Sequence, residues 1–261
     1  MILILVAKHP TKGKSKTRLA KCVGDDTALK FANAMLDDTI ERLGKGDGER
    51  VLYYAPASAK TSFKERCDRS KQNWTLIPMP VTQNLKSKCL TDLLKHALIT
   101  IRRGRNEHDV VCFCGMDSPT LSLETIRYSA RVAESGKAHI VPANDGGYVL
   151  LSLPSNISAR VFENVVWSSD RTLSTQCDQI RHLGVDVEIS DDVHLDIDEA
   201  CDFDLLKRQC EACEAIRDGC PGTYQLLNKS MVQRKVTWNT RFFLLTGTVL
   251  VSAFTMLKKK L

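Results

Sequence analysis

Asp117 is a candidate metal-binding or catalytic residue because of the residues around it. The run from Val110 to Cys114 is short, uncharged and mostly apolar, which predicts a strand buried on both faces. Pro119 keeps Ser118 out of the helical region, so Asp117 is expected on an extended turn at the carboxyl end of that strand. Ligands bind at this edge of open α/β sheets, where a carboxylate can hold Mg²⁺ or Mn²⁺ against nucleotide phosphates. An aspartate that bonds its own turn fits the same sequence.

A dense run of cations follows the first predicted strand. Residues 8–21 contain six lysines and arginines and no acid. This density inside a domain favours an anionic partner, although a solvated loop can have the same composition. Arg18 suits bidentate contacts with phosphate, whereas Lys8 and Lys16 act as point charges. We therefore expect these three side chains to bind a diphosphate or a triphosphate.

The segment Gly13-Lys14-Ser15 leaves a second interpretation of this loop open. Gly-Lys-Ser after a strand is the end of the Walker motif, in which backbone amides wrap a phosphate. That motif requires a glycine where Lys8 stands, and Pro10 stiffens the loop. A P-loop NTPase is therefore a minor alternative.

Strands that alternate with helices would position these side chains. The spacing predicts one Rossmann-like α/β domain, with a mostly parallel sheet and helices on both of its faces. Strands are expected at residues 1–7, 51–55, 74–77, 110–114, 139–143, 148–153 and 185–189. Helices are expected near residues 25–43, 57–69, 88–103 and 123–135, before residue 181, and near residues 199–217.

The net charge of +6 is concentrated at the C-terminal end. Residues 229–261 contain seven cations and no acid, which leaves 30 Lys and Arg against 31 Asp and Glu in residues 1–228. The predicted body does not attract polyanions through its bulk charge, so no nucleic-acid partner is expected. Ten cysteines without a preceding secretory signal indicate reduced thiols in a cytosolic setting. Cys210 and Cys213 lack a second ligand pair, so ordinary thiols are a better interpretation than zinc ligands.

The residues from Phe242 to Leu257 form an uncharged stretch between Arg241 and a run of lysines. As a helix this stretch would be about 24 Å long, a marginal membrane span, and a peripheral or buried helix is the alternative. We therefore expect a transferase body over residues 1–220, a basic linker over 221–241 and a C-terminal hydrophobic membrane anchor over 242–257. The body would face the cytoplasm on an intracellular membrane.

Residues 6–19 resemble the first loop of a bacterial family of glycosyltransferase-A-like transferases. Genes of that family often lie near radical-SAM and selenodomain genes, and the family is related to 2-phospholactate and molybdenum-cofactor guanylyltransferases. The family loop reads roughly Ala-Lys-x-Pro-x-x-Gly-x-x-Lys-Thr-Arg-Leu. The matching positions here are Ala7, Lys8, Pro10, Gly13, Lys16, Thr17, Arg18 and Leu19.

Four later segments resemble the same family in the same order, so the match spans residues 1 to about 210. They are Gly115-Met-Asp-Ser-Pro119, Asp145-Gly-Gly-Tyr148, Trp167-Ser-Ser-Asp170 and Asp196-Ile-Asp198. Two segments depart from the family pattern. Cys89-Leu-Thr-Asp-Leu93 stands where the family has an Asp-Leu-Gly-x-Arg-like segment, and Ala200 stands where it has a proline.

The resemblance implies a nucleotide-diphospho-sugar transferase fold and a site that uses Mg²⁺ or Mn²⁺. Asp117 would hold the metal from one side and Asp198 or Asp196 from the other, while Asp145 would orient the acceptor. The residues expected to bind the nucleotide are Lys8, Lys16, Thr17, Arg18, Gly146 and Gly147. The residues expected to act in catalysis are Asp117, Asp145 and Lys16.

Three functions follow from these expectations. The first is a glycosyltransferase that takes a nucleotide-sugar donor and a small-molecule acceptor. The second is a nucleotidyltransferase that joins a nucleoside triphosphate to a phosphorylated small molecule. The third is an inactive, membrane-tethered family member, which the joint presence of Lys16, Arg18, Asp117 and Asp145 argues against.

Overall fold

The computed structural model describes residues 1–80, 90–103 and 109–229. These residues form a seven-stranded sheet in the order β3-β2-β1-β4-β6-β5-β7. The strands are β1 (Ile2–Lys8), β2 (Glu49–Ala55), β3 (Thr75–Pro78), β4 (Val111–Gly115), β5 (Ala138–Pro142), β6 (Tyr148–Leu153) and β7 (Val187–Ile189).

The sheet is mostly parallel, as predicted. The pairs β1–β2, β2–β3, β1–β4 and β5–β7 are parallel. Strand β6 runs antiparallel to both of its neighbours, β4 and β5. The cause is the turn at residues 143–147, which joins β5 to β6 as a hairpin and leaves no room for a crossover helix. The carboxyl ends of β1 and β4 therefore lie side by side, and β6 begins next to them.

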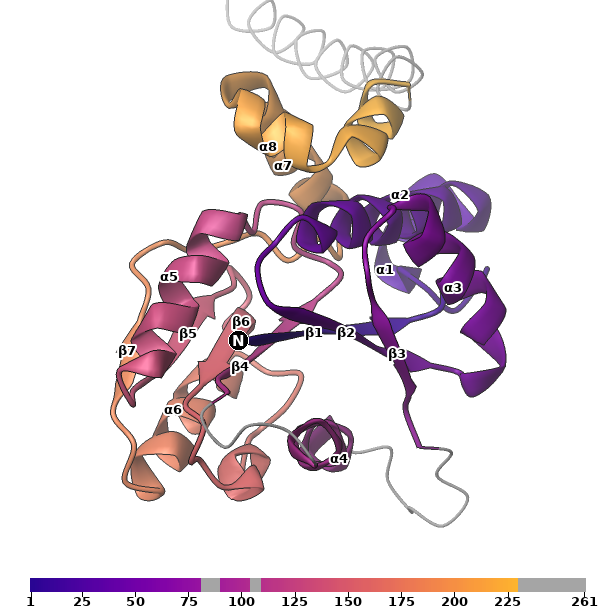
Figure 1. Cartoon of the computed structure of the whole chain (residues 1–261). Helices are drawn as coiled ribbons and strands as arrows, with labels where there is room; N and C mark the ends of the chain where they lie inside the picture. The colour runs from indigo at the N-terminus through magenta and orange to yellow at the C-terminus, as the bar shows by residue number, and fades with distance from the viewer. Residues whose placement is uncertain (81–89, 104–108, 230–261) are drawn as a thin grey trace, which may run out of the picture.

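Helices cover both faces of the sheet (Figure 1). They are α1 (Thr17–Val23), α2 (Asp25–Gly44), α3 (Lys60–Arg69), α4 (Leu90–Arg102), α5 (Leu123–Glu134), α6 (Thr172–His182), α7 (Ala200–Ala212) and α8 (Glu214–Gly219), with 3-10 turns η1 (Ala57–Ala59) and η2 (Ala159–Phe162). Helix α1 was not predicted, because its residues belong to the segment that we interpreted as a cationic loop.

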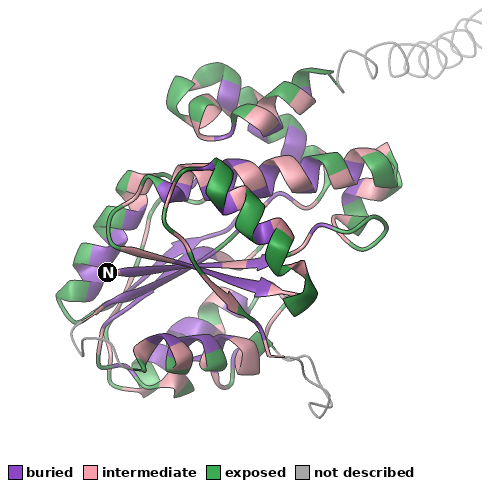
Figure 2. Ribbon diagram, turned by 45° about the vertical axis from the view of Figure 1, so that its right-hand side comes forward, coloured by how far each residue is buried: buried purple, intermediate pink, exposed green. Residues whose placement is uncertain are grey.

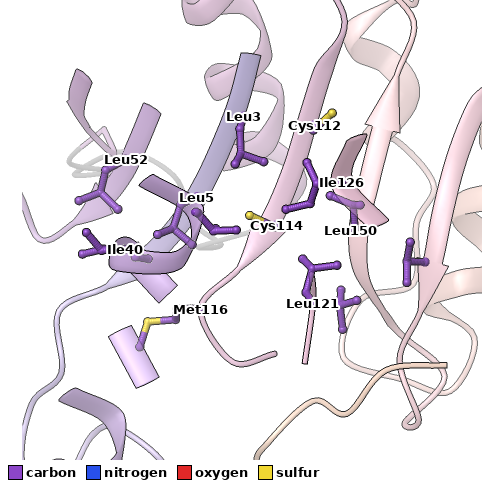
Figure 3. Packing of buried hydrophobic residues seen from close by; sticks show 14 of the residues in the cluster. Leu3, Leu5, Ile40, Leu52, Cys112, Cys114, Met116, Leu121, Ile126 and Leu150 are labelled. Atoms are coloured by element: carbon purple, nitrogen blue, oxygen red, sulfur yellow. The ribbon is translucent and has the colours of Figure 1, made fainter. Parts of the chain in front are cut away.

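Alternating side chains of the central strands divide the core into two layers. On β1, Leu3 and Leu5 pack with side chains of α2, α3 and α5, whereas Ile2 and Ile4 pack with side chains of α4, α6 and η2. Figure 2 shows the central strands as almost continuously buried. Figure 3 shows the first layer, where Leu3 and Leu5 share one cluster with Cys112 and Cys114 of β4. Burial on both faces explains why these strands lack a polar alternation.

The last predicted helix, over residues 199–217, is wrong in one respect. The chain forms two helices, α7 and α8, because Cys213 between them adopts an extended conformation with φ −135° and ψ 115°. The break turns α8 back onto α2, where Arg42 Nη1 donates a hydrogen bond of 2.7 Å to the carbonyl of Gly219. This packing contact between distant residues overrides the continuous helical pattern.

Residues 221–229, where we expected the start of a basic linker, are helical. Thr223 and Leu227 are buried, and Leu227 packs in a third apolar cluster with residues of α1, α2 and α7. The Asp38 carboxylate of α2 accepts hydrogen bonds from Gly222 N, Thr223 N and Thr223 Oγ1 at 3.0, 2.8 and 2.7 Å. The division of the chain into domains stays a prediction.

The expected membrane anchor at residues 242–257 lies outside the described residues, as does most of the expected linker. Within the described part of the chain, no helix combines the length and the apolar character needed to cross a membrane. No disulfide joins the cysteines of that part.

Candidate functional site

A buried lysine connects the first loop to two aspartates. Lys16 Nζ lies 2.7 Å from Asp117 Oδ1 and 3.0 Å from Asp198 Oδ1, and it donates a short hydrogen bond to the carbonyl of Ile197. Only 6% of the Lys16 side chain is exposed, whereas the two aspartates are 38% and 47% exposed. Burial lowers the pKa of Lys16, but the carboxylates of Asp117 and Asp198 outweigh it and the pKa lies above its ordinary value. The lysine is therefore charged at neutral pH.

Three segments that meet at the carboxyl edge of the sheet bring these three residues together. Asp117 follows β4, and Lys16 immediately precedes α1 in the left-handed conformation, with φ 50° and ψ 46°. The 196–198 segment reaches the same edge after β7, where Ile197 N donates a 3.0 Å hydrogen bond to the carbonyl of Asp117. The amides of Asp198 and Glu199 donate to Asp202 Oδ2, which fixes the start of α7.

Asp196 adds a third carboxyl group to this edge. Its amide donates a 3.0 Å hydrogen bond to the Asn144 side chain, which ties the 196–198 segment to the turn between β5 and β6. The pKa of Asp196 rises to about 7, mainly because the carboxyl is largely buried and next because the Asp117 carboxylate is close. Asp198 and Asp145 act in the same direction, and the Lys16 ammonium acts against them. The edge therefore carries more negative charge than its one buried ammonium can balance.

The Asp-Gly-Gly turn supplies the fourth carboxylate. Asp145 is exposed, and its Oδ1 accepts a 2.9 Å hydrogen bond from Gly147 N. Gly146 has φ 88°, and a Cβ placed there would lie 2.6 Å from the Cα of Asp170. A glycine is required because the turn packs directly against the backbone of residues 169–170. Leu173 N also donates a 3.0 Å hydrogen bond to the Gly146 carbonyl, so the turn and the start of α6 form one wall.

A cavity of about 550 Å³ opens at this edge, next to the ends of β1 and β4 and the start of β6. Its basic and acidic lining side chains are one guanidinium and four carboxyl groups. Those residues are Arg18, Asp145, Asp170, Asp196 and Asp198. Its apolar lining comes from α4, β4, η2 and the loop before α6. Those residues include Leu90, Leu94, Phe113, Phe162 and Trp167. The lining of the cavity thus combines acidic and aromatic side chains.

Trp167 and Tyr148 are held in place by their polar atoms. Trp167 Nε1 donates a 2.8 Å hydrogen bond to Thr91 Oγ1, and its ring meets the Tyr148 ring edge-on with centroids 6.4 Å apart. Tyr148 OH donates to Gln176 Oε1 at 3.1 Å, and burial raises the pKa of this phenol. Tyr148 is therefore a neutral packing residue, and the Trp167 ring is positioned beside the cavity as a rigid apolar surface.

The predicted site residues divide into three groups. Lys16 and Asp117 form the ion-paired cluster with Asp198. Around that cluster, Arg18, Asp145, Gly147 and Asp196 line the cavity. Arg18 is 66% exposed, with Nη1 3.8 Å from a carboxylate oxygen of Asp198 and from one of Glu199. Lys8, Thr17 and Gly146 do not line the cavity, and both Lys8 and Thr17 point to solvent.

Several lining residues were missed from the sequence. Phe113 and Phe162 read as ordinary core residues, and they do pack edge-on with centroids 5.3 Å apart. Asp170 lies at the end of the Trp-Ser-Ser-Asp segment, which was noted as a motif without a role for its acid. The position of that motif beside the Asp-Gly-Gly turn was the signal that could have identified Asp170.

The donor atoms suit a hard divalent cation, although they do not form a complete protein cage. No group of three or more His, Cys, Asp or Glu side chains within the described ranges is arranged to hold a metal ion. The Lys16 ammonium is itself a cation on two carboxylates and one carbonyl, all of them oxygen donors. Mg²⁺ needs only one or two carboxylates when phosphate oxygens and water complete its shell. The donor set around Lys16 therefore fits Mg²⁺ or Mn²⁺.

Comparisons with known proteins agree with this fold. The model of a family described as "Uncharacterized protein conserved in bacteria (DUF2064)" matches residues 39–169, half of the chain. A candidate nucleotide-diphospho-sugar transferase of Desulfovibrio desulfuricans G20 superposes with a TM-score of 0.76 over 88% of this chain and 95% of that chain, at 23% identity. CMP:2-keto-3-deoxy-manno-octonic acid synthetase, solved with CTP, superposes with a TM-score of 0.51 over 81% of this chain and 98% of that chain, at 7% identity. No curated protein sequence matches the chain significantly.

Proposed function

This chain belongs to the DUF2064 family, and we propose that it is a metal-dependent transferase that takes a nucleotide-activated donor. One observation carries the proposal. Lys16 bridges the carboxylates of Asp117 and Asp198, and Asp198 lines an acidic and aromatic cavity together with Arg18 at the carboxyl edge of the sheet. Anion-binding cations and metal-type oxygen donors on one rim are what transfer from a nucleotide diphosphate requires.

The donor would bind on the side of the first loop. The exposed guanidinium of Arg18 can form two parallel hydrogen bonds with a phosphate, and Lys8 and Thr17 are exposed on the same stretch of chain. Asp117 and Asp198 would hold Mg²⁺ or Mn²⁺. A bound divalent cation would neutralise the charge that grows on the departing diphosphate.

The acceptor would bind in the cavity. Four carboxyl groups against one guanidinium disfavour a phosphorylated acceptor, because like charges repel strongly where water is partly excluded. A neutral or cationic acceptor can instead place its hydroxyl or amino group on Asp145 and an apolar face on Trp167. This charge pattern favours glycosyl transfer from a nucleotide-sugar, with Asp145 accepting a hydrogen bond from the attacking group.

Nucleotidyl transfer is the second candidate. The first loop contains exposed cations besides Arg18, such as Lys12 and Lys14, and this density suits a triphosphate. One structural relative of the same fold was solved with CTP, a nucleoside triphosphate. In this alternative the phosphorylated acceptor would have to bind outside the acidic cavity.

A thermal-shift screen tests the proposal and separates the two candidates. Nucleotides and nucleotide-sugars are added with Mg²⁺, with Mn²⁺ or with EDTA, because a ligand of the native state raises its melting temperature. We expect stabilisation by a nucleoside diphosphate and its sugar conjugate only when the metal is present. Stabilisation by triphosphates alone would favour nucleotidyl transfer, and no stabilisation by any nucleotide would contradict the proposal. A surface variant, Asp47→Asn, serves as the control for nonspecific charge effects.

We also propose, from the sequence alone, that residues 242–257 attach the protein to a membrane. The support is the uncharged stretch with lysines after it. The chain with and without residues 238–261 is expressed and fractionated after a carbonate wash. Full-length protein in the soluble fraction would contradict this attachment.

A further inference from the structure

Lys16 is bound in the manner of a metal ion. Its ammonium contacts one oxygen each from Asp117, Asp198 and the Ile197 carbonyl, and almost none of the side chain reaches solvent. A lysine that serves only to attract phosphate would extend into water, as Lys12 and Lys14 do in the same loop. The Lys16 side chain instead points inward, away from the loop surface where a nucleotide would approach.

The backbone of Lys16 supports two positions for this side chain. The residue adopts the left-handed conformation, which is unfavourable for an L-residue other than glycine. The neighbouring loop is largely exposed and is closed by local hydrogen bonds, such as those from Lys14 N and Ser15 N to the Thr11 carbonyl, both 3.0 Å, while Lys12 Nζ pairs with Asp26 of α2 at 2.7 Å. The contacts at the ammonium are therefore what hold the left-handed conformation, and their loss would let the residue relax.

We propose that the Lys16 ammonium occupies the position of the divalent cation in the ligand-free protein and leaves it when metal and nucleotide bind together. This inference rests on the proposed function. Asp117, Asp198 and Lys16 sum to one negative charge, whereas the two carboxylates with a divalent cation sum to zero. A divalent cation on the oxygens that Lys16 contacts would lie close to the ammonium, and the repulsion between the two cations in this partly buried position favours displacement of Lys16. Once displaced, the Lys16 ammonium has the donor phosphates as its new partner.

The exchange makes metal and nucleotide binding cooperative. Metal alone must displace Lys16 from its carboxylates, and nucleotide alone must draw Lys16 away while leaving those carboxylates without a counter-ion. When both ligands bind, each removes the cost that opposes the other. By thermodynamic reciprocity, the metal then strengthens nucleotide binding by the same factor as the nucleotide strengthens metal binding.

Binding of Mn²⁺ alone, measured by electron paramagnetic resonance without any nucleotide, tests the exchange. Lys16→Met keeps an unbranched side chain, without the terminal ammonium, and removes the competing charge, so we expect it to bind Mn²⁺ at least about tenfold more tightly than the wild type. Lys12→Met is the matched control, because Lys12 lies in the same loop but pairs with Asp26 at 2.7 Å. It should change the Mn²⁺ affinity by less than about twofold.

The outcomes separate this inference from the proposed function. Equal Mn²⁺ affinity in the wild type and in Lys16→Met would overturn the exchange, while the metal site and the proposed function would stand. Failure of both proteins to bind Mn²⁺, alone and also with UDP or inorganic pyrophosphate, would overturn the exchange together with the metal dependence of the function. Circular dichroism of Lys16→Met shows whether the variant is folded before either result is interpreted.

A measurement on the unmodified chain gives an independent test. A buried, hydrogen-bonded ammonium exchanges its protons slowly, so Lys16 Nζ is expected to give a resolved NMR signal in the ligand-free protein. Adding Mg²⁺ with UDP should abolish or shift this signal, and Mg²⁺ with inorganic pyrophosphate is the probe if UDP does not bind. An unchanged signal while Mg²⁺ and either anion are shown by calorimetry to bind would overturn the exchange.

Discussion

This protein contains two clusters in which carboxylates lie close to a basic side chain. The clusters differ in how their charges are balanced. In the Asp38 cluster, formed by Asp38, Arg42 and residues 219–223, the carboxylate accepts three hydrogen bonds from Gly222 and Thr223. In the Lys16 cluster, formed by Lys16 with Asp117, Asp145, Asp196 and Asp198, one ammonium serves two carboxylates and two more carboxyl groups lie nearby.

The difference indicates what each cluster does. Arg42 donates from both terminal nitrogens to the carbonyls of Ser118 and Gly219, so the Asp38 cluster joins α2 to α8 and to the helix at 221–229. Its hydrogen bonds go to backbone groups and to the buried hydroxyl of Thr223, all of which belong to packed elements. The Lys16 cluster has surplus negative charge and an exposed side. Balanced charges between buried elements stabilise a fold, whereas unbalanced charges at a sheet edge are available for a ligand.

Asp117→Asn should produce the largest effect. It should lower the activity and leave the stability of the fold unchanged. Loss of one anionic oxygen is expected to lower the transfer rate about 1,000-fold, because one of the two carboxylates proposed to hold the metal is removed while the neighbouring Asp198 still pairs with Lys16. Transfer is followed with the donor identified by the thermal-shift screen. Wild-type turnover in this variant would contradict the distinction between a Lys16 cluster that serves a ligand and an Asp38 cluster that stabilises the fold.

Asp38→Ala should produce the opposite result. It leaves the donors of Gly222 and Thr223 without their acceptor, so we expect the free energy of unfolding to fall by about 3–4 kcal/mol. Urea denaturation measures this loss, and Asp47→Asn, an exposed partner of Arg127, is the control expected to change it by less than about 0.5 kcal/mol. The folded variant should bind nucleotide with the wild-type affinity. A loss of affinity without a loss of stability would assign Asp38 to the site.

Arg18→Lys tests whether the exposed rim of the Lys16 cluster binds phosphate. A lysine keeps the charge but cannot form the two parallel hydrogen bonds of a guanidinium, so nucleotide binding should weaken by roughly 1.5–3 kcal/mol. The dissociation constant is measured by calorimetry at physiological salt. An unchanged constant would mean that Arg18 only screens Asp198 and Glu199, from which it lies 3.8 Å away.

Asp196→Asn tests the surplus charge through the pH dependence of stability. The pKa of Asp196 is about 7 in the folded protein and about 4 in the unfolded chain, so the folded state binds the extra proton between these values. The contribution of this group to stability therefore falls as the pH rises from about 4 to 7. Asparagine does not titrate, so the variant should gain stability relative to the wild type over that range and keep the gain at pH 8. A stability difference between the variant and the wild type that does not change with pH would mean that the pKa of Asp196 is not raised in the folded protein.

Much of the fold and part of the site could be predicted because their signals are local. The apolar run before Gly115 and Asp117 predicts a buried strand, and the Asp145-Gly-Gly sequence predicts the tight turn that the structure contains. Parallel strands bring their carboxyl ends to one edge, so the first loop and Asp117 were expected to be neighbours, and the pairing of β1 with β4 agrees.

The remaining features depend on contacts between distant residues. The inward position of Lys16 requires the carbonyl of Ile197 and the Asp198 carboxylate, which come from the other end of the domain. Phe113 lines the cavity although its strand pattern is that of a core residue. No motif singles out Asp38, because a helix with an outward acid looks the same whether or not another helix packs on it. The sequence has no glycine or proline at Cys213 that would predict the break between α7 and α8.

Calorimetric titration of the full chain with the stabilising nucleotide, in Mg²⁺ and then in EDTA, tests the central claim most directly. If the Lys16 cluster is a metal-dependent nucleotide site, the affinity in Mg²⁺ should exceed that in EDTA by at least about tenfold, and Asp117→Asn should abolish this ratio. Equal affinity in Mg²⁺ and EDTA, or a ratio that persists in Asp117→Asn, would contradict it.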